Sequence, residues 1–241
     1  MPQPRVVFEN SLSYLSPVYG NLDMSLFDIF PTFGEAPYSY IVVPIMLVSS
    51  IVGFYHKPYF HALLLHPYEV YQGKRLHTLL TSAFVHRNWL HLVNNLLIIY
   101  GLGYDMFGNI DQEYGGFSAY VLTPILWFAL TVLPNLVQTI SKREDFMFTA
   151  VGASGLSFGL YGFSALFFPV QKMGNLIFPF ITNMFHNWLL GLVVIFLLSV
   201  LNRNKIVNSR LHLSAYIIGG ILGLVVRPSA VIEILDSIFS P

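Results

Sequence analysis

One serine in this sequence stands among small residues, in a segment where a reactive group would be well placed. Ser154 lies within "TAVGASGLSFGLYG", flanked by Gly152 and Gly155. Near the start of a helix, unpaired backbone N–H groups and the positive end of the helix dipole stabilise a developing oxyanion. The spacing of Gly155 and Gly159 is equally typical of helices that pack closely together. From this stretch alone, packing is the favoured interpretation.

Two histidines and an asparagine supply the other groups that acyl transfer requires. A serine nucleophile needs a base within about 2.6–3.2 Å, and a neutral His212 in "LHLSAYIIGGILG" is able to take its proton. In "HRNWLHLVNN", His91 and Asn95 share one helix face and offer side-chain N–H groups to an oxyanion. His86 lies near the turn that precedes them. The pattern predicts a Ser154–His212 dyad rather than a triad, with no metal and no cofactor.

Composition indicates which kind of scaffold must position these side chains. Of the 241 residues, 55% are hydrophobic and only 10% are charged, which is too apolar for a soluble domain of this size. The absence of cysteine excludes disulfides, thiol nucleophiles and thiolate metal sites. A formal net charge of zero argues against a nucleic-acid partner. We expect an integral multi-pass protein in contact with the lipid bilayer, in the cell membrane.

Six segments are apolar over the roughly 20 residues that a membrane span requires. They are residues 38–55, 79–103, 117–140, 146–168, 182–201 and 211–226. Residues 56–75, which prolines and histidines interrupt, are expected at the membrane interface, and residues 230–239 are too few to cross. We therefore predict an all-α bundle of six transmembrane helices over 38–227, after an extramembrane or interfacial segment (1–37) and before a short tail (228–241).

Alternation of direction brings the polar residues of three spans to one depth. The second, fourth and sixth spans begin on the same side of the membrane, and their first turns carry His91, Ser154 and His212. Polar residues inside spans are costly and usually mark a functional site. Small residues at Ala215 and Gly219 would allow the sixth helix to approach the fourth closely enough for His212 to reach Ser154.

Three motifs taken together resemble those of the rhomboid intramembrane serine proteases. "TSAFVHRNWLHLVNN" is similar to the second-helix pattern of that family, "GASGLSFGLYG" to its Gly-x-Ser-Gly element, and "HLSAYIIGGILG" to its sixth-helix histidine. The resemblance covers about residues 38–226. It implies a six-helix bundle that cleaves transmembrane segments of other membrane proteins without a cofactor. It assigns these roles: Ser154 nucleophile, His212 base, His91 and Asn95 oxyanion donors, and His86, Gly152, Gly155 and Phe158 supporting residues, with the Phe158 ring packed on His212.

The sequence departs from the family pattern at three positions. Many relatives have a Trp-Arg pair shortly before the first histidine of the second helix, whereas here Arg75 lies further upstream without a tryptophan, which predicts weaker anchoring of the first loop. Ala215 replaces a glycine that follows the sixth-helix histidine. Asp105 stands near the place of a family glutamate but at a different spacing, so it is not assigned that role.

The distribution of basic residues indicates to which side of the membrane the site opens. The positive-inside rule places the more basic loops in the cytoplasm. The first, third and fifth loops hold nine basic residues against three elsewhere: Lys57, Lys74, Arg75, Arg87, Lys142, Arg143, Arg203, Lys205 and Arg210 against Arg5, Lys172 and Arg227. This predicts a site that opens to the cytoplasm, whereas many rhomboid proteases open to the opposite side. The sequence leaves both directions open.

Two other classes of function compete with the protease. A haem or metal protein would use the eight histidines, but His-Glu-x2-His is absent; His56, His61, His66 and His77 fall in one loop, and His186 begins the fifth span on the opposite side from His212. We expect them to be interfacial or structural. The other class is a catalytically inactive rhomboid-like protein that binds or chaperones membrane-protein clients, which the presence of both Ser154 and His212 opposes. The sequence does not indicate an oligomeric state.

Overall fold

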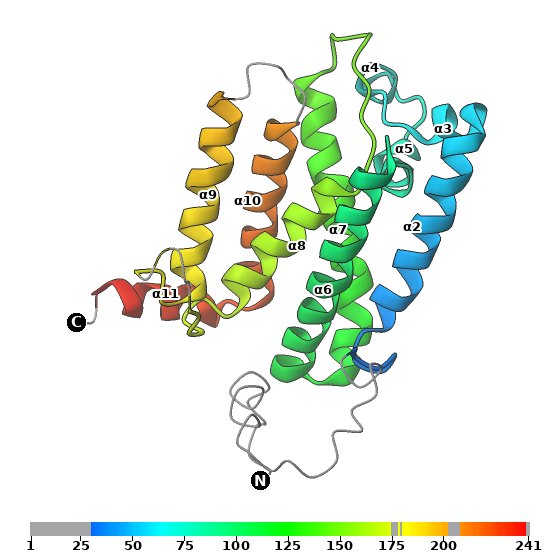
Figure 1. Cartoon of the computed structure of the whole chain (residues 1–241). Helices are drawn as coiled ribbons and strands as arrows, with labels where there is room; N and C mark the ends of the chain where they lie inside the picture. Colours follow the sequence, from blue (N-terminus) through cyan, green and yellow to red (C-terminus); the bar gives the residue numbers. More distant parts are fainter. Residues whose placement is uncertain (1–29, 175–177, 179, 202–207, 240–241) are drawn as a thin grey trace. The chain divides into compact units, whose positions relative to one another are not determined.

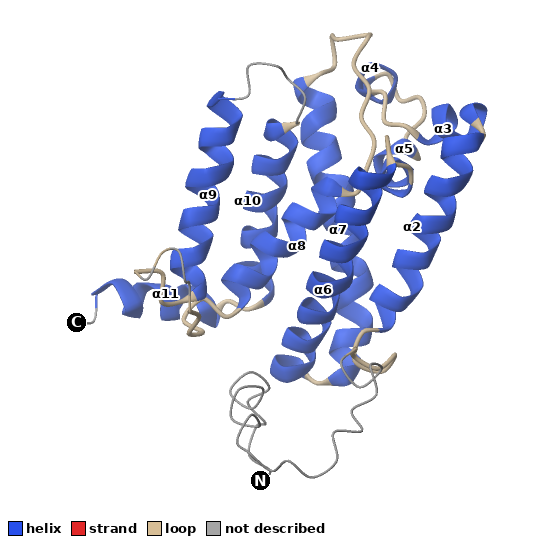
Figure 2. Cartoon of the chain, in the orientation of Figure 1, coloured by secondary structure: helices blue, strands red, loops and turns tan. Residues whose placement is uncertain are grey.

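The computed structural model describes residues 30–174, 178, 180–201 and 208–239. Residues Thr32–Pro241 form one compact unit, and its described part consists of helices joined by loops, as Figures 1 and 2 show. The elements are α2 (Pro37–Tyr55), α3 (Lys57–Leu63), α4 (Pro67–Tyr71), α5 (Thr78–Thr81), the 3-10 turn η2 (Ser82–Phe84), α6 (Trp89–Tyr114), α7 (Gly116–Ser141), α8 (Ser154–Phe167), α9 (Met184–Leu201), α10 (Ser209–Val226) and α11 (Ser229–Phe239).

Four of the described helices are long and apolar enough to cross a membrane: α2, α7, α9 and α10. They correspond to the first, third, fifth and sixth expected spans, with bounds that differ by at most two residues. Helix α7 continues through Pro124 and Pro134, as expected for a helix whose freed carbonyl groups find neighbours in a bundle. The other two expected spans correspond to α6, with 26 residues, and α8, with 14.

The second expected span was wrong at both ends, since α6 continues to Tyr114 rather than ending near Gly103, and the fourth was wrong at its N-terminal end. Helix α6 begins at Trp89 rather than near Leu79, because α5, η2 and a short loop occupy the preceding residues. Helix α8 begins at Ser154, because residues 146–153 form an irregular loop in which Ala150 pairs with Leu65 through two backbone hydrogen bonds of 2.9 and 3.0 Å. The apolar side chains of both segments therefore lie in connecting structure rather than in a membrane-spanning helix.

Arg75 holds the loop between α2 and α5 together. Its guanidinium group donates to the carbonyl groups of Ala62 and Leu64, at 3.1 and 3.2 Å, and to that of His61, so it caps the C-terminal end of α3. It also pairs with Glu69 of α4 at 3.1 Å. One arginine thus ties α3 to α4 without a tryptophan beside it, and a weaker anchoring than in relatives stays a prediction.

Charged loops gather at one end of the described bundle. The first loop, the start of α6, the end of α7 and the start of α10 meet there, and they carry seven of the nine basic residues that the sequence analysis counted in these loops. Lys172 and Arg227 lie at the other end, beyond α8 and α10. Arg5, Arg203 and Lys205 lie outside the described residues.

Helix α8 forms the core of the bundle. Eleven of its 14 residues are buried, among them Leu160 and Phe163 with no exposed surface. Helices α6, α7, α9 and α10 contact it, and Leu130 of α7 completes the packing around it. Helix α9 differs sharply, because its buried residues are Asn187 and Ile195 alone.

Glycines let α8 and α10 approach almost to backbone contact. A Cβ atom added to Gly219 of α10 would lie 1.9 Å from the carbonyl oxygen of Gly159 on α8. One added to Gly162 would lie 2.1 Å from the carbonyl oxygen of Tyr216. A membrane gives helices little hydrophobic drive to associate, so such close dispersion contact is a main source of their affinity.

We expect Gly219→Ala to separate α8 from α10 and to lower the free energy of unfolding by about 1–3 kcal/mol or more, as overpacking does. Thermal unfolding of the purified protein in detergent measures the loss. Gly101→Ala on α6 is the matched control, because a Cβ atom there meets nothing within 4 Å. Equal stability of the two variants would contradict the packing described above.

Candidate active site

Ser154 and His212 meet at the N-terminal ends of α8 and α10. The Nε2 atom of His212 lies 3.0 Å from the Oγ atom of Ser154. The ring of Phe158, one turn further along α8, stacks on the imidazole with centroids 4.3 Å apart and planes at 17°. Both side chains of the pair are partly buried. The arrangement gives a serine hydroxyl, a base within hydrogen-bond reach and an aromatic support that orients the base.

Asn208 determines where α10 begins. Its Oδ1 atom accepts from the backbone N–H of Leu211 at 3.4 Å, in the manner of an N-cap. Its Nδ2 atom donates to Oε1 of Gln138 on α7 at 2.6 Å. Asn208, which lies four residues before His212, therefore fixes the start of α10 against α7. Asn208 was absent from the expected site residues, although an asparagine before an apolar helix is a recognisable cap signal.

Asn88 has the same role for α6. Its Oδ1 atom accepts from the backbone N–H of His91 at 2.9 Å, so His91 lies in the first turn of that helix. One turn later, Asn95 donates through Nδ2 to the carbonyl group of His91 at 2.9 Å and accepts from Oγ of Ser157 at 3.1 Å. The amide has two N–H groups, so one is still available to a further acceptor. Ser157 thereby ties Asn95 to α8, three residues beyond Ser154.

The backbone before Ser154 has a conformation and an environment that favour glycine. Gly152 has a φ angle of +104°, a region that residues with a side chain rarely adopt. Its N–H group donates to the carbonyl group of Ser82 at 2.9 Å. A Cβ atom at this position would lie 2.3 Å from Cε1 of His91. The glycine therefore lets the His91 ring come up against the loop that leads to Ser154.

A chain of hydrogen bonds fixes the orientation and tautomer of His86. The backbone N–H of Ala153 donates to Nε2 of His86 at 3.2 Å, so Nε2 carries no proton. The proton of the neutral ring is then on Nδ1, which lies 2.8 Å from Oγ of Ser50 on α2. Oγ of Ser50 donates in turn to the carbonyl group of Phe84 at 3.0 Å. Each polar atom in this series of hydrogen bonds has a partner. The series links α2 to Ala153, the residue before Ser154.

Other polar residues have partners outside this cluster or are exposed. Asp145 accepts from Lys142 at 3.0 Å, and this hydrogen bond lowers the pKa of the Asp145 carboxyl group. Glu144 pairs with Arg143 at 3.4 Å, and Asn94 is exposed on α6. His56 and His66 accept from backbone N–H groups at the starts of α3 and α4, so they are helix caps. In the described part of the chain, no three histidine, aspartate or glutamate side chains are grouped as metal ligands.

An apolar cavity of about 360 Å³ opens beside His212. Helix α8 contributes Phe158 and Tyr161 to its wall, and α9 contributes mainly aliphatic side chains such as Leu190 and Val194. The hydroxyl of Tyr161 accepts from Asn187 at 2.6 Å, which joins α8 and α9 at the wall of the cavity. An apolar segment is therefore the kind of ligand that this space favours.

Comparison with known proteins accounts for this arrangement. A family model described as the Rhomboid domain matches residues 73–229, which is well over half of the chain. The chain belongs to the rhomboid family. All of the expected site residues, from His86 to His212, fall within the matched rhomboid domain. Membership of this family, together with several apolar helices, makes the chain an integral multi-pass membrane protein.

A curated relative is similar to part of this chain. Rhomboid-like protein 11, chloroplastic, from Arabidopsis thaliana is 33% identical over 87 residues, which make up 36% of this chain and 27% of the relative. The match thus spans about a quarter of the length of that protein. The relative supports the family and membrane integration, whereas activity and substrates remain questions for this chain's own site.

We expect Gly152→Ala to destabilise the protein more than Gly115→Ala does. Both glycines have a positive φ angle, at +104° and +82°, so both variants carry backbone strain of about 1–2 kcal/mol. At Gly152 the methyl group must also displace the His91 ring, whereas at Gly115 it meets nothing within 4 Å. Thermal unfolding of the two variants measures the difference, and equal losses would show that the His91 contact is unimportant.

Proposed function

We propose that this rhomboid-family protein is an intramembrane serine endopeptidase that cleaves transmembrane segments of other membrane proteins. The observation that carries the proposal is the 3.0 Å contact between Oγ of Ser154 and Nε2 of His212. Its wider support is that His91 lies against Gly152, in the loop that precedes Ser154, while Asn95 is hydrogen-bonded to Ser157, three residues after it. Phe158 stacks on the proposed base and keeps its Nε2 atom directed at the hydroxyl.

In this mechanism the dyad performs acyl transfer without a third residue. Nε2 of His212 takes the hydroxyl proton as Oγ of Ser154 attacks the substrate carbonyl carbon. The resulting oxyanion accepts from the backbone N–H of Ser154 and from side-chain N–H groups of His91 and Asn95. His212 then donates its proton to the leaving amine, and the C–N bond breaks. Water attacks the acyl-enzyme by the same route, with His212 as base, and releases the second product.

We also propose that α6 and α8 complete a bundle of six membrane-crossing helices with α2, α7, α9 and α10. The surroundings of α8 support this, because a helix buried by its neighbours can be shorter than the bilayer, with non-helical backbone completing the crossing. The substrate would then approach from the lipid. The apolar cavity beside His212, which α9 lines, supports binding of an apolar segment there.

Labelling with a fluorophosphonate, which reacts with activated serines, tests the proposed nucleophile. We expect the purified wild type to be labelled and Ser154→Ala not to be labelled. His212→Ala should be labelled about 10²–10⁴-fold more slowly, because the base is lost. Ser214→Ala is the matched control, since that hydroxyl donates to its own helix at Leu211, 3.0 Å away. A wild type without labelling would favour a rhomboid protein that binds clients without cleaving them.

A second test concerns the hydrogen-bond chain through His86. Ser50→Ala leaves Nδ1–H of His86 buried without its acceptor, so the ring loses the bond that orients it toward Ala153. One lost hydrogen bond of about 1–1.5 kcal/mol corresponds to roughly tenfold slower labelling of Ser154. Ser49→Ala is the control, because the neighbouring hydroxyl bonds to Tyr59 at 2.9 Å instead. Equal labelling rates in the two variants would show that α2 does not influence the nucleophile.

A further inference from the structure

The last helix of the chain has one apolar face that the described protein does not cover. At 100° per residue, Ser229, Glu233, Asp236 and Ser237 fall on one side of α11. The opposite side carries Val231, Ile232, Leu235, Ile238 and Phe239, all exposed, with Ile232 at 62% and Phe239 at 77%. Ala230 is the buried residue of the helix. Eleven residues are too few to cross a bilayer, so α11 is not a membrane span. Its apolar face must therefore contact something other than the described protein.

Arg227 fixes the rotation of α11 about its own axis. This buried arginine follows the end of α10 and forms two hydrogen bonds with the carboxylate of Glu233, on the polar side of α11. It also pairs with Glu113 at the end of α6 at 3.1 Å and donates to the carbonyl group of Phe167 at the end of α8 at 3.0 Å. One guanidinium group therefore connects α11 to two other helices. The apolar side of α11 consequently faces away from this cluster.

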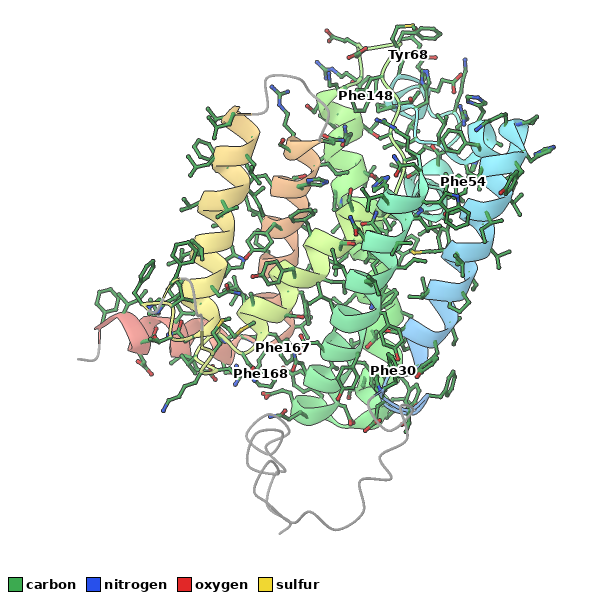
Figure 3. All side chains as sticks on the ribbon, in the orientation of Figure 1. Phe30, Phe54, Tyr68, Phe148, Phe167 and Phe168 are labelled. Atoms are coloured by element: carbon green, nitrogen blue, oxygen red, sulfur yellow. The ribbon has the colours of Figure 1, made fainter. Side chains whose placement is uncertain are left out.

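Several observations place α11 at the boundary of the membrane. It begins three residues after Val226, the end of a helix long and apolar enough to cross, and it runs across the ends of α9 and α10 (Figure 1). Aromatic side chains gather at this end: Tyr114 donates to the carbonyl group of Val226 at 2.7 Å, and Phe117 is 85% exposed. Phe168, which is partly buried, lies at the same end, opposite Tyr68 and Phe148 (Figure 3). Aromatic belts mark the two interfaces of a membrane protein.

We propose that α11 is an in-plane interfacial helix whose apolar face inserts at the boundary between lipid headgroups and acyl chains. The bilayer is the favoured occupant over a protein partner, because it already surrounds the end of α10 and needs no recruitment. A helix with one charged and one aliphatic side is suited to this position. The Arg227–Glu233 pair then serves to keep Ile232 and Leu235 turned to lipid and Asp236 turned to water.

Fluorescence quenching in vesicles tests this position, and a chain without cysteine allows single-site labelling. Ile232→Cys and Leu235→Cys probe the apolar face, and Asp236→Cys and Ser237→Cys are the matched polar-face controls. Each variant carries an environment-sensitive nitrobenzoxadiazole label in phosphatidylcholine vesicles with a lipid nitroxide near the headgroup end of the acyl chain. We expect blue-shifted emission and strong quenching at 232 and 235, and neither at 236 and 237.

Two outcomes would overturn the proposal. Equal quenching at all four positions would show that α11 has no fixed face toward lipid. Labels at 232 and 235 that are shielded from water but unquenched by the nitroxide lipid would show that protein, such as a second copy of the chain, covers the face. The role of the ion pair is tested separately by adding Glu233→Gln, which should reduce the contrast between the faces. Glu113→Gln, which removes the other carboxylate on Arg227, should retain it.

Discussion

The contact between α8 and α10 is the constraint on which the proposed site depends. Ser154 and His212 belong to different helices, and each lies in the first turn of its own. Their distance therefore follows from how closely the two backbones approach, which Gly159 and Gly219 set about one turn and two turns further along. In lipid the association of helices relies on such dispersion contact, since burial of apolar surface contributes little. The glycines that pack and the serine proposed as the nucleophile are parts of one arrangement.

A second constraint acts on the polar atoms around the serine. A buried donor or acceptor without a partner costs about 1–3 kcal/mol, and in a membrane no bulk water compensates. The bonds that satisfy His86, Ser50 and Ala153 are the same bonds that orient the loop before Ser154. Asn95 and Ser157 connect α6 to α8 in the same way. The precision of the site thus arises from the cost of leaving its polar groups unpaired.

The sequence predicts those parts of the structure that leave a regular pattern in it, such as a long apolar run or small residues at a helical spacing. Long apolar runs predicted α2, α7, α9 and α10 almost to the residue, and small residues in α10 predicted its close approach to α8. The starts of α6 and α8 were not predicted, because hydropathy does not distinguish a helix from an apolar loop, such as the one in which Ala150 pairs with the distant Leu65. The hydrogen-bond partner of His86, Ser50, was not predicted for a related reason. Ser50 is one of several serines in an apolar helix, and only the fold brings it to the ring.

The length of α8 bears on how deep in the bilayer Ser154 would lie. Fourteen residues at 1.5 Å each give about 21 Å, whereas the hydrocarbon core of a bilayer is about 30 Å thick. Arg227 binds the carbonyl end of α8 at Phe167, so the proposed interfacial position of α11 also fixes the depth of that end. Ser154, at the other end, would then lie about 9 Å or more beneath the opposite surface, because an inclined helix spans less depth than its length. The proposed hydrolysis at that depth requires water to reach Ser154 from the surface, and the loop of residues 142–153, which begins with four charged side chains, connects the surface to Ser154.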